Sequence, residues 1–525
     1  MAIADKLTHL NDTKLLLRDA IRRAGHYLPD SATLRSYPYA LLPDEASLNM
    51  DFVRGEYVAH NWRDGTVSRA GLSNIMTTTR GSGGGYFDHL GVYQWAANNV
   101  PRIDHDPATL STSTSSVTLA SGSVTLAVTV TYPVGAYVRA TADASNWLSG
   151  RVTASTGSSV TLWVDRVVGS GTYASWTVIR VLGLLVEESR TNLLTYSSDF
   201  ANAAWTKSGA SIDSSGSVQR IVESLTATDV LHAAYRASGV TTAVSQSIVY
   251  SVRAKAAGRN RLRLRLRLRL ASSGDGLNGT FLADANFNLA TGQYISGTNA
   301  GAAISRIGTD EYLISVAAIA TSAVTSCAIL LISDAGSTTY TGDGTSGIYI
   351  WGAQLEQGAF PTSYIPTTTA QVTRAADIAS VNELSPWFNA SEGTFFIESI
   401  NRQRPLGGTF GLSIGTSGAD YIGSPYHTKT GVSASLYASV GGISKNVAVA
   451  QSPDKIAFSY GSDGVIALVA GGVSYGSMTH AALPTFSNLL IGRGHFGGGP
   501  APAHYKSISF YPRRLSNDDL QRLTS

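Results

Sequence analysis

Five consecutive Arg-Leu repeats occupy residues 261–270 and form the most unusual segment of the sequence. A strict period of two predicts a β-strand with the arginines on one face and the leucines on the other. Arginine binds carboxylate and phosphate groups bidentately, so Arg263, Arg265 and Arg267 are candidate ligands for acidic surface glycans. Like charges on one strand face repel each other. The alternative is therefore a solvated face, or one paired with acidic residues of a neighbouring strand or subunit.

Aromatic residues near the end of the chain are the second set of candidates. Tyr421, Tyr426 and His427, together with Tyr437, fall in Gly/Ser-rich stretches, where we expect loops to expose them. A flat ring against the C–H face of a sugar, flanked by polar donors, is the physical basis of glycan binding. The alternative is that these rings pack the edges of their module.

Motifs for catalysis do not stand out. The acidic residues are scattered, and no pair is recognisable that would flank a glycosidic bond. The sequence has no His-Glu-x-x-His helix and no His/Cys cluster, and the glycines at 81–85 lack the setting of a phosphate loop. Asp343 is interpreted as a turn residue, with a structural calcium site as the alternative. We therefore expect no catalytic residue, no enzyme activity and no cofactor, and a metal stays an open question.

The composition is typical of a β-protein with several domains. The 525 residues exceed the roughly 250–300 at which a single core stops growing. Charged residues make up 14%, well below the roughly 25% of globular domains, and Gly, Ser, Thr and Ala take their place. The net charge of +3 is close to neutral and by itself says nothing about partners. Outside the Arg-Leu repeats the chain shows no basic balance and no interleaved aromatic residues, so we expect no nucleic-acid partner. No apolar run is long enough to span a membrane and no signal peptide is visible, so we expect no membrane insertion. The single cysteine, Cys327, lies in an apolar run and is interpreted as a buried small hydrophobe.

A heptad pattern in residues 3–24 predicts a short N-terminal coiled-coil helix. A helix of three heptads is marginal alone, so its seam should be buried against copies of itself or another protein. The candidate oligomerisation residues are Ile3, Leu7, Leu10, Leu17 and Ile21. The alternative is an amphipathic helix that docks on its own domain.

Several phrases of the sequence resemble those of phage and prophage structural proteins. They are VPRIDHDP at 100–107 and GLLVEESRTNLL at 183–194, separated here by a β-unit at 108–180 that is similar to a module of phage tail proteins. Residues 348–358 are similar to the closing strand of carbohydrate-binding jelly rolls, and 505–520 to the end of a concanavalin-type (laminin-G-like) sandwich. The resemblance implies that these phrases are scaffold: Trp351 and Leu355 would pack a core, and Glu187 and Glu188 would cap or bridge.

Together these observations predict a mostly β protein of several β-sandwich or jelly-roll modules behind the N-terminal helix. The expected segments are an attachment or trimerisation helix at 1–25, a mixed connector at 26–107, a small inserted β-domain at 108–182, a jelly roll at 183–370, a linker at 371–392 and a laminin-G-like sandwich at 393–525.

The resemblance implies a fibre or spike subunit on the surface of a phage particle, made in the host cytoplasm. Its expected partners are itself, as a homotrimer, other virion proteins at the N-terminus, and host surface polysaccharide. The alternatives are a purely architectural head, collar or tail decoration protein without a ligand, and a glycan depolymerase.

Overall fold

The computed structural model describes residues 46–226, 228–236, 240–268, 281–298, 301–321, 324–400, 410–425, 434–449, 454–495 and 502–525. Within these ranges the chain is mostly β, in several sheets, which confirms the predicted fold class. The predicted N-terminal helix and its residues Ile3, Leu7, Leu10, Leu17 and Ile21 lie outside the described residues. Within the described residues, no helix is both long and apolar enough to cross a membrane.

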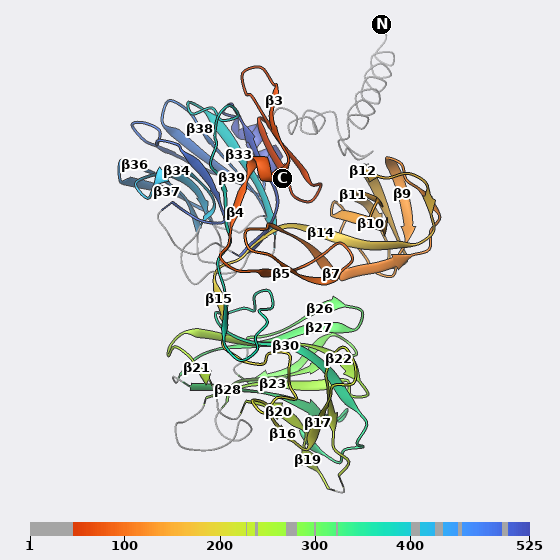
Figure 1. Cartoon of the computed structure of the whole chain (residues 1–525). Helices are drawn as coiled ribbons and strands as arrows, with labels where there is room; N and C mark the ends of the chain where they lie inside the picture. Colours follow the sequence, from red (N-terminus) through yellow and green to blue (C-terminus); the bar gives the residue numbers. More distant parts are fainter. Residues whose placement is uncertain are drawn as a thin grey trace.

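A two-sheet sandwich forms the lower part of the molecule in Figure 1. Its core contains Trp205, Cys327 and Leu355, all fully buried, whereas Trp351 is only half-buried. One sheet contains β16 (Thr206–Ser208), β20 (Ala233–Tyr235), β21 (Val240–Thr241), β28 (Val324–Ile332), β23 (Arg261–Leu268), β24 (Phe281–Asn288) and β25 (Gln293–Thr298). The other contains β17 (Ala210–Asp213), β18 (Arg220–Glu223), β30 (Gly347–Gln357), β22 (Ser247–Ala257), β27 (Glu311–Ile319) and β26 (Gly301–Gly308). We refer to this unit as the jelly roll, and it confirms the buried positions expected for Cys327 and Leu355.

Both ends of the jelly roll leave it side by side. The strands β15 (Arg190–Asn192) and β31 (Val372–Arg374) pair antiparallel, with Thr191 opposite Thr373. Figure 1 shows β15 running between the jelly roll and the rest of the molecule. The jelly roll is therefore an insertion with adjacent ends, and we call the remaining described residues the base.

Strands from both ends of the chain build the large sandwich of the base. One sheet has the order β40-β39-β38-β33-β42, to which β1, β2 and β3 are added, and the other has the order β37-β36-β35-β34-β41-β32-β4. Their bounds are β1 (Leu48–Asp51), β2 (Glu56–His60), β3 (Val67–Ala70), β4 (Thr77–Thr79), β32 (Ile378–Val381), β33 (Gly393–Ile400), β34 (Phe410–Ser417), β35 (Asp420–Pro425), β36 (Ala434–Val440), β37 (Ile443–Val449), β38 (Lys455–Tyr460), β39 (Val465–Ala470), β40 (Val473–Thr479), β41 (Asn488–Ile491) and β42 (Ala503–Tyr511). Between the two sheets lies one apolar core, in which Trp387, Phe395 and Phe510 are fully buried.

This arrangement corrects two of the expected segments. The described part of the 26–107 region, residues 46–107, is not a separate connector, because β1 pairs with β42 and Met50 is opposite Ile508. The 371–392 region is not a linker, because β32 is a strand of the second sheet and Trp387 packs edge-to-face on Phe510 at 5.4 Å. Among the described residues, both segments contribute to the hydrophobic core of the last module instead of forming a separate one.

The smaller unit of the base continues the same sheet. It contains β7 (Arg102–Ser113), β9 (Gly122–Ala127), β10 (Tyr137–Asp143), β11 (Asn146–Ser155), β12 (Ser159–Val168) and β14 (Trp176–Val186) around an apolar core of its own. The predicted boundaries at 107/108 and 182/183 fall inside β7 and β14. Since β14 pairs with β10 and β7 along its length and with β42 at its end, the unit has no break at either boundary.

Two local predictions hold. Residues 261–268 form a β-strand, β23, which lies in the interior of its sheet between β28 and β24. The register places Leu264 and Leu266 opposite Ile329 and Cys327, both of which are buried in the jelly-roll core. The chain ends in α4 (Asn517–Thr524), whose predicted N-cap Ser516 accepts a hydrogen bond from the backbone of Asp519.

Candidate functional site

A buried cluster of charges lies where the chain passes from the base into the jelly roll. Arg102 donates to Glu187 at 2.7 Å and also to Asp377, and Arg80 donates to Asp377 at 2.7 Å. Arg374 lies 3.6 Å from Glu187, and all three arginine side chains are fully buried. The segments 100–107 and 183–194 are thus joined by the ion pair between Arg102 and Glu187. This confirms the expectation that Glu187 bridges.

The charges in this cluster hold one another in the ionised state. Burial alone would raise the pKa of Glu187, but Arg374, Arg102 and hydrogen bonds from Ser363 bring it well below its usual range. Ser363 is a jelly-roll residue, and both its backbone N–H and its hydroxyl donate to Glu187. The three guanidinium groups are fully buried, and the cluster joins residues of the base to Ser363 of the jelly roll, so we infer that it fixes the jelly roll on the base.

Next to this cluster, residues of the base and of the jelly roll line a cleft of about 520 Å³, and Glu187 and Ser363 are among them. Its base wall carries Asp104 and Asp106, which alternate on β7 and therefore share one face of the strand. His504 lies 2.8 Å from Asp104, and Arg180 lies 3.6 Å from Asp106. Burial raises the pKa of Asp106, although Arg180 opposes this shift.

Arg253 of the jelly roll lies against aromatic rings from both units, Tyr93 from the base and Tyr364 from the jelly roll. The guanidinium of Arg253 lies 4.1 Å from the ring centre of Tyr93 and 5.8 Å from that of Tyr364. Burial lowers the pKa of Arg253. Phe360, Gln354 and the exposed Arg306 also line the cleft. The cleft thus combines carboxylates, guanidinium groups, an amide and flat rings.

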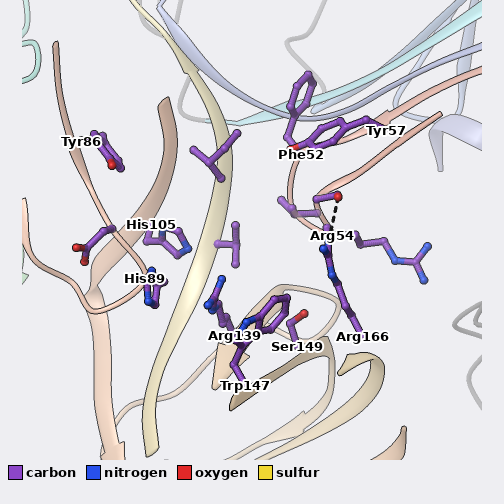
Figure 2. Close-up of a pocket in the computed structure, with 15 residues that line it drawn as sticks. Phe52, Arg54, Tyr57, Tyr86, His89, His105, Arg139, Trp147, Ser149 and Arg166 are labelled. Atoms are coloured by element: carbon purple, nitrogen blue, oxygen red, sulfur yellow. Dashed lines mark hydrogen bonds between the residues drawn. The ribbon is translucent and has the colours of Figure 1, made fainter. Parts of the chain in front are cut away.

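A second hollow of about 340 Å³ lies in the base on the other face of β7 and β14. Ile103, His105 and Val181 line it, whereas Asp104, Asp106 and Arg180 line the cleft. This division follows from the alternation of side chains along a strand. Figure 2 shows this hollow, which we call the arginine pocket, with Arg139 lying against Trp147.

The residues predicted from the sequence do not gather at either site. Arg263, Arg265 and Arg267 lie on β23, and their backbone register places Arg265 opposite Asp284 of β24 and Ala328 of β28. Their glycan binding stays a prediction. Tyr421 was expected in an exposed loop, but it lies in β35 and only 5% of it is exposed. Its ring stacks on His495 at 6.4 Å.

The other candidates have different outcomes. Tyr426 and His427 lie outside the described residues. Tyr437, on β36, is 38% exposed. Asp343 is a turn residue, as interpreted: its carboxylate accepts from the backbone N–H groups of Thr345 and Ser346, both at 2.7 Å.

The cleft residues were missed for different reasons. The spacing of Asp104 and Asp106 did carry a signal, since alternate residues of a strand share a face. Arg253 carried none, because the cleft forms only where β7 and β22, far apart in the sequence, come together. In the part of the chain that the structure describes, no group of three or more His, Cys, Asp or Glu residues could hold a metal ion.

Comparisons with known proteins assign this chain to no family. No protein-family model matches the sequence, and no curated protein matches it significantly. One similar solved structure is the CBM40 of the Ruminococcus gnavus IT-sialidase bound to α2,3-sialyllactose, with 16% identity over 26% of this chain and 84% of that chain and a TM-score of 0.22. Domain 4 of AbnA, a GH43 arabinanase from Geobacillus stearothermophilus in complex with arabinotriose, shares 9% identity over 32% of this chain and 84% of its own, with a TM-score of 0.23.

A third similar structure extends over most of the chain. The Trypanosoma rangeli sialidase in complex with sialic acid covers 85% of this chain and 98% of its own, at 12% identity and a TM-score of 0.22. At such TM-scores these likenesses say nothing about what this chain binds.

Proposed function

We propose that this chain is a non-enzymatic subunit on the surface of a phage particle that binds host surface polysaccharide in the cleft between its base and its jelly roll. The observation that carries this proposal is the lining of the cleft. The phrases at 100–107 and 183–194, which resemble those of phage structural proteins, support the location in a virion.

The lining suits a sugar chain for physical reasons. Carboxylates accept hydrogen bonds from sugar hydroxyls, and guanidinium and amide groups donate to them. Flat rings such as Tyr93 and Tyr364 offer an apolar surface to the C–H face of a pyranose. The volume of about 520 Å³ lies within the usual range for small-molecule sites, roughly 300–1,000 Å³. One or two sugar units of a longer polysaccharide would fit.

Assembly would raise the strength of attachment. We propose that the N-terminal segment trimerises the chain and joins it to other virion proteins, so that several clefts act on one surface. Linked weak sites gain affinity through their effective concentration without any new contact.

The test is binding of fluorescently labelled full-length chain to intact host cells, beside a mutant of the host that lacks its outer polysaccharide. We expect binding to the first and none to the second. Asp106→Asn should weaken binding about tenfold, because a hydrogen bond to a charged group contributes roughly 1.5–3 kcal/mol. Asp213→Asn is the matched control, since Asp213 pairs with Arg220 at 3.3 Å on β17, and Asp213 does not line the cleft. Equal binding to both host strains contradicts the proposal.

The alternative function is that of a glycan depolymerase, because two carboxylates line the cleft. Asp104 and Asp106 line the same wall, and the pKa of Asp106 is raised. Asp104, however, is already engaged by His504 and by the backbone N–H of Phe87 at 2.7 Å. Incubation with purified polysaccharide, followed by size-exclusion chromatography, separates the two functions: shortened chains indicate an enzyme, and unchanged chains an adhesin.

A further inference from the structure

The arginine pocket is lined by three arginines from three separate segments of the base. Arg54 follows β1, Arg139 lies on β10 and Arg166 on β12. Two of them are already engaged. Arg54 forms an ion pair with Asp165 at 2.8 Å, and Arg166 donates to the carbonyl oxygens of Arg54 and Gly55.

Arg139 differs from the other two. Its Nε donates to the hydroxyl of Thr141 at 3.1 Å. Among the residues that the structure describes, no carboxylate lies within ion-pair distance of its guanidinium. Burial and the nearby charge of Arg166 lower the pKa of Arg139 to about 10. Arg139 therefore keeps its charge at neutral pH, and no carboxylate of the described residues pairs with it directly.

The indole ring of Trp147 contacts the guanidinium groups of both Arg139 and Arg166. The guanidinium of Arg139 lies 4.0 Å from the ring centre of Trp147, and that of Arg166 lies 5.2 Å from it (Figure 2). A cation is attracted to the face of an indole, and here the ring holds two cations in one hollow. Their mutual repulsion would be relieved by an anion that reaches Arg139.

The other lining residues include neutral polar groups and one carboxylate, that of Asp88. His105 lies with its Nδ1 3.1 Å from the carbonyl oxygen of Phe87, and since a carbonyl can only accept, Nδ1 carries the proton. Burial lowers the pKa of His105 to about 4, so the ring is neutral at pH 7 and its Nε2 is an acceptor. His89 packs beside it, and Tyr86 and Tyr57 also line the hollow. Asp88 lines it as well, and its carboxylate accepts hydrogen bonds from the backbone N–H groups of Leu90 and Val92 and from the side-chain amide of Gln94. Acceptors and hydroxyls of this kind suit the hydroxyl groups of a ring.

We propose that the arginine pocket binds an acidic monosaccharide unit, with its carboxylate on the guanidinium of Arg139 and its hydroxyls toward His105 and Tyr86. A planar carboxylate matches the fork of a guanidinium, which can bind it through two parallel hydrogen bonds. The volume of about 340 Å³ suits one sugar unit and not a longer chain. This pocket is separate from the cleft, so the proposal for the pocket does not depend on the function proposed for the cleft.

The test is calorimetric titration of the full-length chain with D-glucuronate, D-glucose and D-glucose 6-phosphate at low salt. We expect glucuronate to bind at least tenfold more tightly than glucose, and the difference to shrink as salt is added. Equal binding of glucuronate and glucose, or no binding of glucuronate, overturns the proposal and needs no variant. Tighter binding of glucose 6-phosphate than of glucuronate overturns the assignment to a carboxylate and assigns the pocket to phosphate.

Variants locate the site. Arg139→Met keeps an apolar stem against Trp147 and removes the charge, so glucuronate affinity should fall at least tenfold while glucose binding stays the same. Arg63→Met is the matched control, because Arg63 also lies over a tryptophan, Trp62, at 5.1 Å, but neither residue lines the pocket. Unchanged affinity in Arg139→Met overturns the proposal. Asp106→Asn should leave glucuronate binding intact, so loss of cell attachment in that variant together with retained glucuronate binding separates the cleft from the pocket.

Discussion

At the scale of single residues, Asp377 holds the junction between the base and the jelly roll. Its carboxylate accepts from Arg80, from Arg102 and from the backbone N–H of Glu187 at 2.8 Å. Asp377→Ala would leave three buried guanidinium groups with Glu187 as their one remaining carboxylate in the cluster. We expect a loss of roughly 3–5 kcal/mol in the free energy of unfolding, the usual cost of breaking a buried ion pair. Chemical denaturation would measure it. Asp64→Ala, at an exposed turn, is the control and should leave the unfolding midpoint close to that of the wild type.

The same cluster predicts how stability depends on pH. The pKa of Glu187 is lower in the folded chain than in the unfolded chain, because burial is outweighed by Arg374, Arg102 and Ser363. Such a group stabilises the fold above its unfolded pKa, about 4.3, and this stabilisation is lost as the pH falls through lower values. We expect the melting temperature of the wild type to drop steeply from about pH 4 downward. Glu187→Gln should be less stable at pH 7 and should show a shallower drop, and an equally steep drop in the variant would contradict this account.

At the scale of elements, β14 connects the two units of the base because it changes partner near Gly183. Gly183 has a φ of +110°, and a Cβ at this position would lie 2.1 Å from the carbonyl oxygen of Tyr505 on β42. Gly183→Ala should therefore cost roughly 3 kcal/mol or more, from left-handed strain and overpacking together. Gly122→Ala is the matched control, since Gly122 has a φ of +106° and no atom within 4 Å of the added Cβ. It should cost only the strain, roughly 1–2 kcal/mol. Equal unfolding midpoints for the two variants would contradict the role of Gly183.

Local elements could be predicted from the sequence, and their assembly could not. The period of two in residues 261–268 predicts β23, and Ser516 predicts the start of α4, because each signal lies within a few residues. The pairing of β1 with β42 joins residues about 460 positions apart, and nothing in either strand specifies its partner. Trp387 shows the same limit. The strands that pack around it lie both before and after it in the sequence, so its own segment carried no sign of a core and was predicted to be a linker.

The candidate site follows the same rule. Asp104 and Asp106 were recognised as part of a phrase, but the phrase meets Arg253 only because the jelly roll packs back on β7. The repetition of the arginines at 261–269 suggested a binding face, yet β23 lies in the interior of its sheet, between β28 and β24. Repetition in a sequence predicts the face of a strand, whereas a site needs the neighbours that the tertiary fold provides.

At the scale of the whole molecule, the jelly roll is an insertion that the base should not need in order to fold. The β15–β31 pair brings its two ends together, and of the buried charge cluster only the partner Ser363 belongs to the jelly roll. Replacing residues 193–371 with a short Gly-Ser linker should leave a base that unfolds cooperatively, because its two largest apolar cores come from residues outside the excised range.

A fragment of residues 393–525 is the opposite case, because it lacks β1, β4, β32 and Trp387, which complete both sheets and the core of the large sandwich. We expect thermal unfolding followed by circular dichroism to show a sharp transition for the excised base and none for the fragment. A sharp transition for the fragment would mean that the last module folds without its N-terminal strands. Loss of the transition in the excised base would mean that the jelly roll holds the base together, and the cleft would then be a contact within one cooperative unit.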